Sequence, residues 1–461
     1  MILSHFLSAL LVLSLVILTY YFFLLAVYSL IQFLSLLQLK RRMRVVRAGA
    51  RLPEEALTPV SVIVPAFNES ATIVQSVASF LAQDYPGVEV IVVNDGSSDD
   101  TMLRLQQAFD LIPLQADRAG PLPCQPLLAA YTGRSLPNLI VLDKANGGKS
   151  DALNAGLNAA HHPLVCCVDA DSLLAPNAVR QLACHFARRE DTVAVGGIVR
   201  PLNGCTVRNG LVEQVRLPGS ALERMQVVEY LRAFLTGRLG WESLGSLLIV
   251  SGAFGMFDRN TLLAAGGYSR TVGEDAELTL RLHRFCRQTG RPCRIVLAPD
   301  ALCWTQAPSR LDDLRTQRMR WQRGLAESLY RHRSMLLNPR YGTVGMLALP
   351  FAWLAELLGP VVELLGHLLV VLAIVFGVAA PQALMLVAMA YLHGVVQSVL
   401  AVAAEDRATR LYTDRGSTAA LILACFAEPL FYRPITVLWR CLALFTLWRA
   451  PAWGSIRRQA F

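Results

Sequence analysis

Several patterns that define common classes of protein are missing from this sequence. None of its ten cysteines forms a CxxC pair, and no cluster of cysteine and histidine has the spacing of a zinc site. The stretch NGGKS at 146–150 ends like a phosphate-binding loop, but Asp143 stands where the GxxxxGKS pattern requires a glycine. Cys166 and Cys167 lie inside an apolar run, so we interpret them as small buried hydrophobes in a reducing compartment. A zinc module and a P-loop are therefore excluded.

Charged residues are also scarce, at 17%, whereas hydrophobic residues make up 54% of the 461 positions. This composition predicts a globular domain joined to membrane helices, because it is too apolar for a soluble chain and too charged for an all-membrane one. The net charge of +9 is typical of the excess of cytoplasmic Lys and Arg in membrane proteins, and it also suits anionic membrane lipids or a phosphate-bearing substrate. No nucleic-acid-binding motif accompanies the charge, so we expect no nucleic-acid partner.

A long apolar run lies near the start of the chain. Residues 6–39 are almost uncharged, long enough to span a bilayer and too long for the core of a signal peptide. The basic stretch KRRMRVVR follows at 40–47, and the positive-inside rule places it in the cytoplasm. The sequence therefore predicts a transmembrane helix within 1–39 and a basic cytoplasmic linker over 40–57.

Membrane character returns in residues 336–461. Apolar runs at 366–380 and 383–404 are predicted to be spans, and the arginine-rich stretch at 405–415 to be a cytoplasmic loop. Two further segments contain prolines and charges, so each is either interfacial or a broken span: 341–358 and 418–447. The basic, aromatic tail WRAPAWGSIRRQAF is expected inside. We predict three spans plus interfacial helices, or five spans if both doubtful segments cross.

Residues 58–335 alternate short β-rich runs with helical stretches. This alternation predicts an α/β domain whose parallel sheet is covered on both faces. Sheets of this kind bind ligands just beyond the carboxyl ends of their strands. Polar residues gather where the predicted strands end, at 65–69, 94–96, 143–144 and 169–171. We therefore expect the ligand site at this edge of the sheet.

Asp169 and Asp171 follow the apolar strand VCCV directly. Residues i and i+2 at the end of a strand can point the same way, and two carboxylates suit Mg²⁺ or Mn²⁺ bound to a substrate diphosphate. The alternative is an Asx turn or a helix cap ahead of Pro176. The pair alone does not decide between them.

Asp95 and Lys149 each have two interpretations. Asp95 lies in NDGSS, whose residues strongly favour a turn, but its carboxylate is also suited to accept hydrogen bonds from a base or a ribose. Lys149 follows two glycines at a predicted helix start, where it either meets a phosphate or is a solvated lysine after a glycine turn.

Two predicted helices carry further candidates. Glu274 and Asp275 begin an amphipathic helix, where acids either complement the helix dipole or supply a general base for an acceptor hydroxyl. Gln317, Arg320 and Trp321 share one helical face by their i, i+3, i+4 spacing. That face could stack a ring and pair with a diphosphate, or it could belong to a basic interfacial helix with a Trp anchor.

These motifs occur together and in order. They are Asp95, the DxD motif Asp169-Ala170-Asp171, Gly273-Glu274-Asp275, and the QxxRW motif Gln317-Arg318-Met319-Arg320-Trp321. Over roughly residues 58–325 the chain resembles the membrane-integrated inverting glycosyltransferases of family 2, which include cellulose, hyaluronan, chitin and poly-N-acetylglucosamine synthases. The stretches VPAFNES and NGGKSDALNAG resemble that family as well. The chain departs from the family at Gly273, where Thr is commoner, and in having fewer predicted spans than the best-known synthases.

The resemblance implies a GT-A (Rossmann-like) fold, a UDP-sugar donor and a divalent cation, Mg²⁺ or Mn²⁺. It implies that Ala66, Glu69 and Asp95 hold the uridine. It implies that Asp171, with Asp169 alongside, holds the metal and the diphosphate. Asp275, next to Glu274, would be the base. The residues that would cap the diphosphate and the acceptor end are Gln317, Arg320 and Trp321.

The leading hypothesis is therefore an enzyme that extends a β-linked exopolysaccharide at the inner or plasma membrane, as a multi-pass protein with a cytoplasmic catalytic domain. UDP-N-acetylglucosamine and UDP-glucose are the favoured donors. The acceptor would be a glycan, and a second copy of the chain or an accessory secretion subunit would complete the apparatus. The first alternative is transfer of a single sugar to a lipid or glycolipid acceptor. The second is a catalytically dead scaffold that binds a UDP-sugar.

Overall fold

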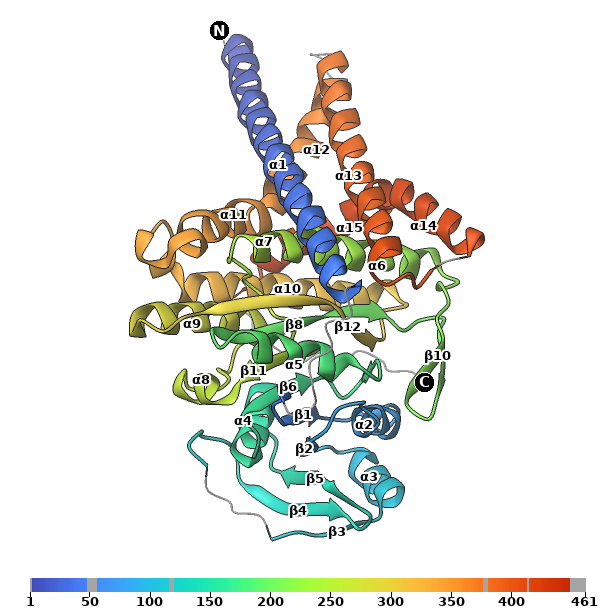
Figure 1. Cartoon of the computed structure of the whole chain (residues 1–461). Coiled ribbons are helices and arrows are strands. Elements are labelled where there is room, and N and C mark those ends of the chain that lie inside the picture. Colours follow the sequence, from blue (N-terminus) through green and yellow to red (C-terminus); the bar gives the residue numbers. More distant parts are fainter. Residues whose placement is uncertain (1, 48–55, 116–119, 376–379, 413, 448–461) are drawn as a thin grey trace.

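The computed structural model describes residues 2–47, 56–115, 120–375, 380–412 and 414–447. Residues 48–55 of the predicted basic linker and the whole basic tail lie outside the described residues. The described residues form three layers, namely a sheet domain, a layer of helices that lie across it, and a group of long helices that rises away from both (Figure 1).

A ten-stranded sheet forms the core of the first layer, with the order β3-β4-β5-β2-β1-β6-β11-β8-β12-β7. Its strands are β1 (Val60–Ala66), β2 (Val88–Asp95), β3 (Leu111–Pro113), β4 (Leu127–Gly133), β5 (Leu136–Lys144), β6 (Leu164–Val168), β7 (Ser172–Leu174), β8 (Thr192–Pro201), β11 (Phe254–Asp258) and β12 (Arg294–Thr305). A separate hairpin pairs β9 (Thr206–Arg208) with β10 (Leu211–Gln214). The prediction of a parallel sheet was only partly right. Strands β5, β2, β1 and β6 are parallel, but β11 enters antiparallel between β6 and β8, and β3, β4 and β7 also pair antiparallel.

The continuous apolar strands are buried on both faces. In β1, Val62 and Val64 pack with Ile73 in one hydrophobic cluster, whereas Ile63 packs with Leu157 in the other. Neighbouring side chains of a strand point to opposite faces, so a strand covered on both sides needs apolar residues at every position. Helix α4 (Lys149–Ala159) packs on β1 and β2, helix α2 (Ile73–Leu81) packs on β2 and β7, and α3 (Thr101–Phe109) packs on α2 and β3. Helix α5 (Ala178–Arg188) packs on β8, β11 and β12.

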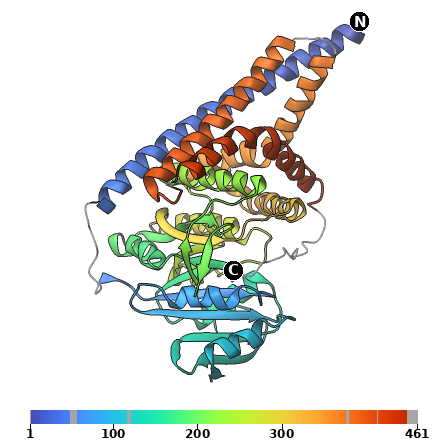
Figure 2. The same ribbon diagram turned by 90° about the vertical axis from the view of Figure 1, so that its right-hand side faces the viewer.

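A layer of helices separates the sheet from the rising helices (Figure 2). It contains α6 (Ala221–Leu231), the π-helix η2 (Arg232–Arg238), α7 (Leu239–Ser243), α9 (Glu274–Thr289), α10 (Leu311–Arg331), α11 (Leu349–Phe351), the π-helices η6 (Ala352–Leu357) and η7 (Glu428–Tyr432), α14 (Arg415–Ala427) and α15 (Arg433–Leu444). Its outer residues include Leu423, Phe431 and Phe445, which are 70%, 63% and 77% exposed. Such an exposed apolar surface is suited to contact with a membrane.

Helices α1 (Ile2–Arg47), α12 (Gly359–Val375) and α13 (Ala380–Ala408) pack against one another and rise together from the helical layer (Figure 1). Among the described residues, three segments are long and apolar enough to cross a membrane: Val12–Met43, Val387–Ala408 and Arg415–Leu444. A fourth is the pair Val344–Leu357 and Gly359–Leu372, which is bent by 44°. Arg415–Leu444 passes this test by length and composition, but its helices α14 and α15 lie across the rising helices. These apolar helices indicate association with a membrane.

Candidate active site

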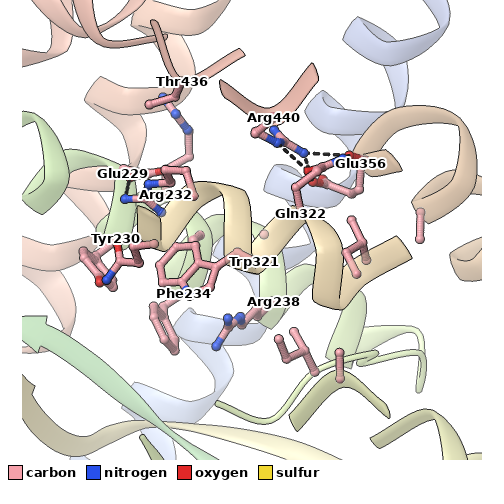
Figure 3. Close-up of a pocket in the computed structure, with 18 of the residues that line it drawn as sticks. Glu229, Tyr230, Arg232, Phe234, Arg238, Trp321, Gln322, Glu356, Thr436 and Arg440 are labelled. Atoms are coloured by element: carbon pink, nitrogen blue, oxygen red, sulfur yellow. Dashed lines mark hydrogen bonds and ion pairs between the residues drawn. The ribbon is translucent and has the colours of Figure 1, made fainter. Parts of the chain in front are cut away.

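One cavity of about 1080 Å³ connects the ends of the strands with the rising helices. Its lower wall contains Asp169, Asp171 and Asp275, and its upper wall contains Tyr28 of α1 and Gln397 of α13. Figure 3 shows the part of this cavity that lies around Trp321, where side chains from η2, α10, η6 and α15 converge. The polar ends of the strands and the rising helices α1 and α13 therefore share one continuous space.

Asp169 and Asp171 lie in the short connection between β6 and β7, and both line the cavity. Strand β6 is buried throughout, which explains the unbroken apolar run that precedes the acids. Asp171 is 3% exposed and accepts a hydrogen bond from Ser172 Oγ, with Oγ and Oδ1 3.3 Å apart. Across the described residues, no group of three or more His, Cys, Asp or Glu side chains could hold a metal ion by itself. Two carboxylates can still hold Mg²⁺ when substrate phosphates and water supply the other ligands.

Lys149 lies at the first position of α4 and joins two of the acidic motifs. Its Nζ is 2.7 Å from Asp169 Oδ1 and 2.9 Å from Glu274 Oε1, and it donates to the Gly252 carbonyl at 3.4 Å. Burial disfavours the ammonium form, but the charges of the two acids outweigh this effect and raise the pKa of Lys149 above its ordinary value. Lys149, whose side chain is 14% exposed, is therefore a largely enclosed cation within the site, not a solvated lysine after a turn.

Asp275 faces the cavity from the first turn of α9. The Gly252 amide donates to its Oδ2 at 3.2 Å, and the Ala276 amide donates to its Oδ1 at 2.8 Å. Gly252 belongs to the stretch SGAFG at 251–255, so this loop contacts both Asp275 and Lys149. These bonds fix the orientation of a carboxylate that remains open to the cavity, which is what a general base requires.

Close packing explains why a glycine, Gly273, precedes Glu274 and Asp275. A Cβ on Gly273 would lie 2.8 Å from the Cα of Gly324, and a Cβ on Gly324 would lie 2.8 Å from the Cα of Gly273. The backbone at the start of α9 thus touches the backbone of α10 just after the QxxRW motif. A threonine at position 273 would collide with this contact, which accounts for the departure from the commoner pattern.

Three residues expected to hold a nucleoside differ in their placement. Glu69 lines the cavity, whereas Ala66 and Asp95 are buried and do not line it. The amides of Gly147 and Gly148 donate to the Asp95 carboxylate at 3.0 and 2.7 Å. Lys144 also forms an ion pair with it. In this structure Asp95 therefore organises the glycine loop that leads into Lys149.

The QxxRW residues lie together on α10, as their spacing predicts. Gln317, Arg320 and Trp321 all line the cavity, and Trp321 is 44% exposed. Arg318, which the spacing did not single out, lies 4.2 Å from the centre of the Trp321 ring and forms a 2.6 Å ion pair with Glu229. The guanidinium therefore supports the ring from one side and leaves it available to a ligand.

Sequence reasoning missed the ion pairs of the upper cavity. Each joins an arginine and a glutamate that both line it: Arg232–Glu428 (2.9 Å), Arg318–Glu229 (2.6 Å), Arg433–Glu363 (2.8 Å) and Arg440–Glu356 (3.7 Å). The signal was present, because several of these charges interrupt the doubtful segments 341–358 and 418–447. Nothing in the sequence says which charges pair.

The lower cavity has a different charge balance. Five carboxylates line it, those of Glu69, Asp169, Asp171, Glu274 and Asp275. The cations that line the same region are Lys149, Arg238 and Arg320. This surplus of acidic side chains favours a bound cation. In the upper cavity each glutamate is paired with an arginine, so no counter-ion is needed.

Two family models match the part of the chain that contains this site. The model for glycosyl transferase family 2 matches residues 61–120, and the model for glycosyltransferase-like family 2 matches residues 129–324. Together these matches cover more than half of the chain and contain the DxD acids, Asp275 and the QxxRW motif. The chain is a family 2 glycosyltransferase.

Curated relatives of this glycosyltransferase include poly-beta-1,6-N-acetyl-D-glucosamine synthases. That of Staphylococcus epidermidis is 26% identical over 278 residues, which are 59% of this chain and 56% of the relative. That of Staphylococcus aureus strain COL is 27% identical over 279 residues, which are 60% and 57% of the two chains. The match thus spans little more than half the length of these relatives.

A solved structure shares the fold. The mannosyltransferase PcManGT from Pyrobaculum calidifontis, in complex with GDP-Man and Mn²⁺, superposes with a TM-score of 0.50 and 18% identity. The superposition covers 92% of this chain and 97% of that one. The domain therefore has a GT-A-like mixed sheet, with apolar helices toward both ends of the chain.

Proposed function

We propose that this glycosyltransferase uses a UDP-sugar to extend a β-linked exopolysaccharide, with UDP-N-acetylglucosamine or UDP-glucose as donor. One observation carries the proposal: the DxD acids, Asp275 and the QxxRW residues meet in a cavity that continues to the membrane helices. The likeness to poly-beta-1,6-N-acetyl-D-glucosamine synthases supports both the donor class and the polymeric product. The basic flank of α1 supports a cytoplasmic catalytic domain.

The donor would bind in the lower cavity. Glu69 and the loop organised by Asp95 would contact the uridine, and Arg320 and Gln317 would contact the diphosphate. Asp171, with Asp169, would hold Mg²⁺ or Mn²⁺, and the two-carboxylate set fits a metal that also takes phosphate ligands. When bound, the metal neutralises charge on the departing diphosphate. Lys149 would then be free to leave Asp169 and to contact a phosphate, while its bond to Glu274 remains.

The acceptor would approach from the upper cavity, its terminal ring on Trp321. Its hydroxyl oxygen attacks the anomeric carbon while the bond between that carbon and the diphosphate oxygen breaks. Asp275 takes the hydroxyl proton, and UDP leaves. One in-line displacement inverts the anomeric centre, so an α-linked donor gives a β-linkage. The acceptor glycan would extend past the neutral ion pairs toward the membrane, where a second copy of the chain or an accessory subunit would assist secretion.

A second candidate is transfer of one sugar to a lipid-linked acceptor. The observation that favours it is the apolar wall that α1 contributes to the cavity, which includes Phe22, Leu24 and Leu25. A hydrocarbon chain could lie against this wall while its head group reaches Trp321.

Release of UDP by the purified full-length protein, incubated with single UDP-sugars and Mg²⁺ or Mn²⁺, tests the proposal. Release with one donor, together with a product of high molecular weight, is the expected result. A single small product extracted into organic solvent would support the lipid acceptor instead. No release with any donor would reject both and favour a binding scaffold.

A further inference from the structure

Arg238 lines the cavity, and the proposed reaction gives it no role. It ends the π-helix η2 and lines the cavity near Asp275 and Trp321. Irregular turns of this kind often occur at functional sites. Figure 3 shows its side chain beside that of Phe234, on the side of Trp321 away from Glu356 and Arg440.

The guanidinium of Arg238 is held in place but lacks an acid partner among the described residues. It lies 4.1 Å from the centre of the Phe234 ring, one helical turn earlier. Its Nη1 is shielded from solvent and has no hydrogen-bond partner in the described part of the chain. The four arginines of the upper cavity differ in this respect; Arg232 and Arg433, for example, have acids at 2.9 and 2.8 Å. A buried donor without a partner is costly. The other guanidinium nitrogens are not sealed in this way and have no hydrogen-bond partner among the described residues either, so the side chain favours a cavity ligand that supplies acceptors.

The surroundings of Arg238 define where that ligand would lie. Asp275 is close enough to raise the pKa of Arg238, although burial has the larger effect and lowers this pKa to about 10, so the side chain stays protonated at neutral pH. Tyr230 lies within electrostatic reach of both Arg238 and Asp171. Asp275 and Tyr230 are thus neighbours of Arg238 in the cavity, so a ligand bound by Arg238 would also lie near the proposed base.

We propose that Arg238 is a phosphate-binding residue that donates to an oxyanion at the junction of the donor and acceptor halves of the cavity. This inference rests on the proposed function. A guanidinium that is fixed by stacking and has unused donors is suited to bind phosphate through two parallel hydrogen bonds. The oxyanion has two sources, namely the diphosphate of the donor or the phosphate of a lipid-linked acceptor.

Binding measurements on the full-length protein in lipid nanodiscs test this role. We expect Arg238→Gln to weaken the binding of inorganic pyrophosphate and UDP, in the presence of Mg²⁺, by about 10- to 100-fold. Uridine binding should not change. Arg238→Lys should recover part of the loss, because it keeps the charge but not the paired donors. Arg208→Gln, on the exposed hairpin strand β9, is the matched control and should bind like the unaltered protein.

A different set of results would identify the lipid-linked acceptor, and not the donor, as the source of the phosphate. In that case UDP and pyrophosphate bind normally to Arg238→Gln, but the KM for a polyprenyl-phosphate-linked acceptor rises while that for a neutral oligosaccharide does not. Unchanged values for all these ligands, or an equal loss for uridine and the neutral oligosaccharide, would overturn the proposal. Failure of the unaltered protein to release UDP from any donor would reject the proposed function instead. Pyrophosphate binding, which needs neither sugar nor nucleotide, would still decide the role of Arg238.

Discussion

The balance of acidic and basic side chains differs between the two halves of the cavity. In the upper half each glutamate that lines the cavity has an arginine, so the wall is polar but neutral. In the lower half the acids exceed the cations, and Lys149 links two of them. A neutral polar wall suits an uncharged, hydroxyl-rich chain, whereas an acidic pocket needs a cation to admit a diphosphate. We therefore expect acids of the lower half to control chemistry and acids of the upper half to control stability.

The largest effect is expected from Asp275→Asn. This change keeps the shape of the side chain but removes the base, so transfer should fall by about 10³-fold while UDP binding is retained. Initial rates of UDP release and the Kd for UDP measure the two quantities. Asp312→Asn is the matched control, because Asp312 is an exposed acid in the first turn of α10. If both variants lost activity equally, Asp275 would act only through the helix dipole.

The metal role of the DxD acids predicts the next effect. Asp171→Asn should lower transfer by about 10²-fold, since a ligand to the metal that neutralises the leaving group is lost. Raising the Mn²⁺ concentration should restore part of the rate, and a chelator should abolish transfer by the unaltered protein. A rate that is independent of metal in both proteins would remove the metal from the mechanism and leave Lys149, Arg238 and Arg320 as the cations of the lower half.

The upper half should respond in the opposite way. Glu428 is 1% exposed, and Arg232 donates to it and to Ser398 Oγ at 2.8 Å. Glu428→Gln should destabilise the protein by about 3 kcal/mol, because it leaves a partly buried arginine without its counter-ion. Replacing both members, as Arg232→Met with Glu428→Leu, should recover much of that loss. Thermal unfolding in detergent measures the effect.

An exposed pair provides the control for this comparison. Arg134 and Asp110 form a 2.8 Å ion pair, but their side chains are 64% and 68% exposed. Asp110→Asn should therefore change stability by less than about 1 kcal/mol. If Glu428→Gln were equally mild yet inactive, the upper acids would belong to the chemistry and the division between the halves would fail.

Features of the site that depend on neighbouring residues could be predicted from the sequence, whereas features that depend on distant segments could not. The DxD acids, the start of α9 and the shared face of Gln317, Arg320 and Trp321 depend on a few neighbouring residues, and local patterns predicted them. The antiparallel entry of β11 and the Arg232–Glu428 pair depend on segments far apart in the chain, so no local pattern encodes them. The placement of Asp95 was also hidden, because a turn residue and a ligand-binding residue look alike in sequence.

The smallest predicted effect concerns the contact that joins the two catalytic motifs. Gly324→Ala adds one methyl group where the Gly273 backbone lies 2.8 Å from the added carbon, so α9 and α10 must separate slightly. We expect a loss of about 1–3 kcal/mol in stability, as for overpacked cores, and a several-fold lower rate because Asp275 and Trp321 move relative to each other.

The variant Gly290→Ala tests whether the lower rate comes from the altered spacing of the motifs or from a general loss of stability. Gly290 has open space around it but a φ of +69°. This variant should destabilise the end of α9 through backbone strain without lowering the rate. Equal loss of rate in both variants would mean that general stability, and not the spacing of the motifs, limits transfer.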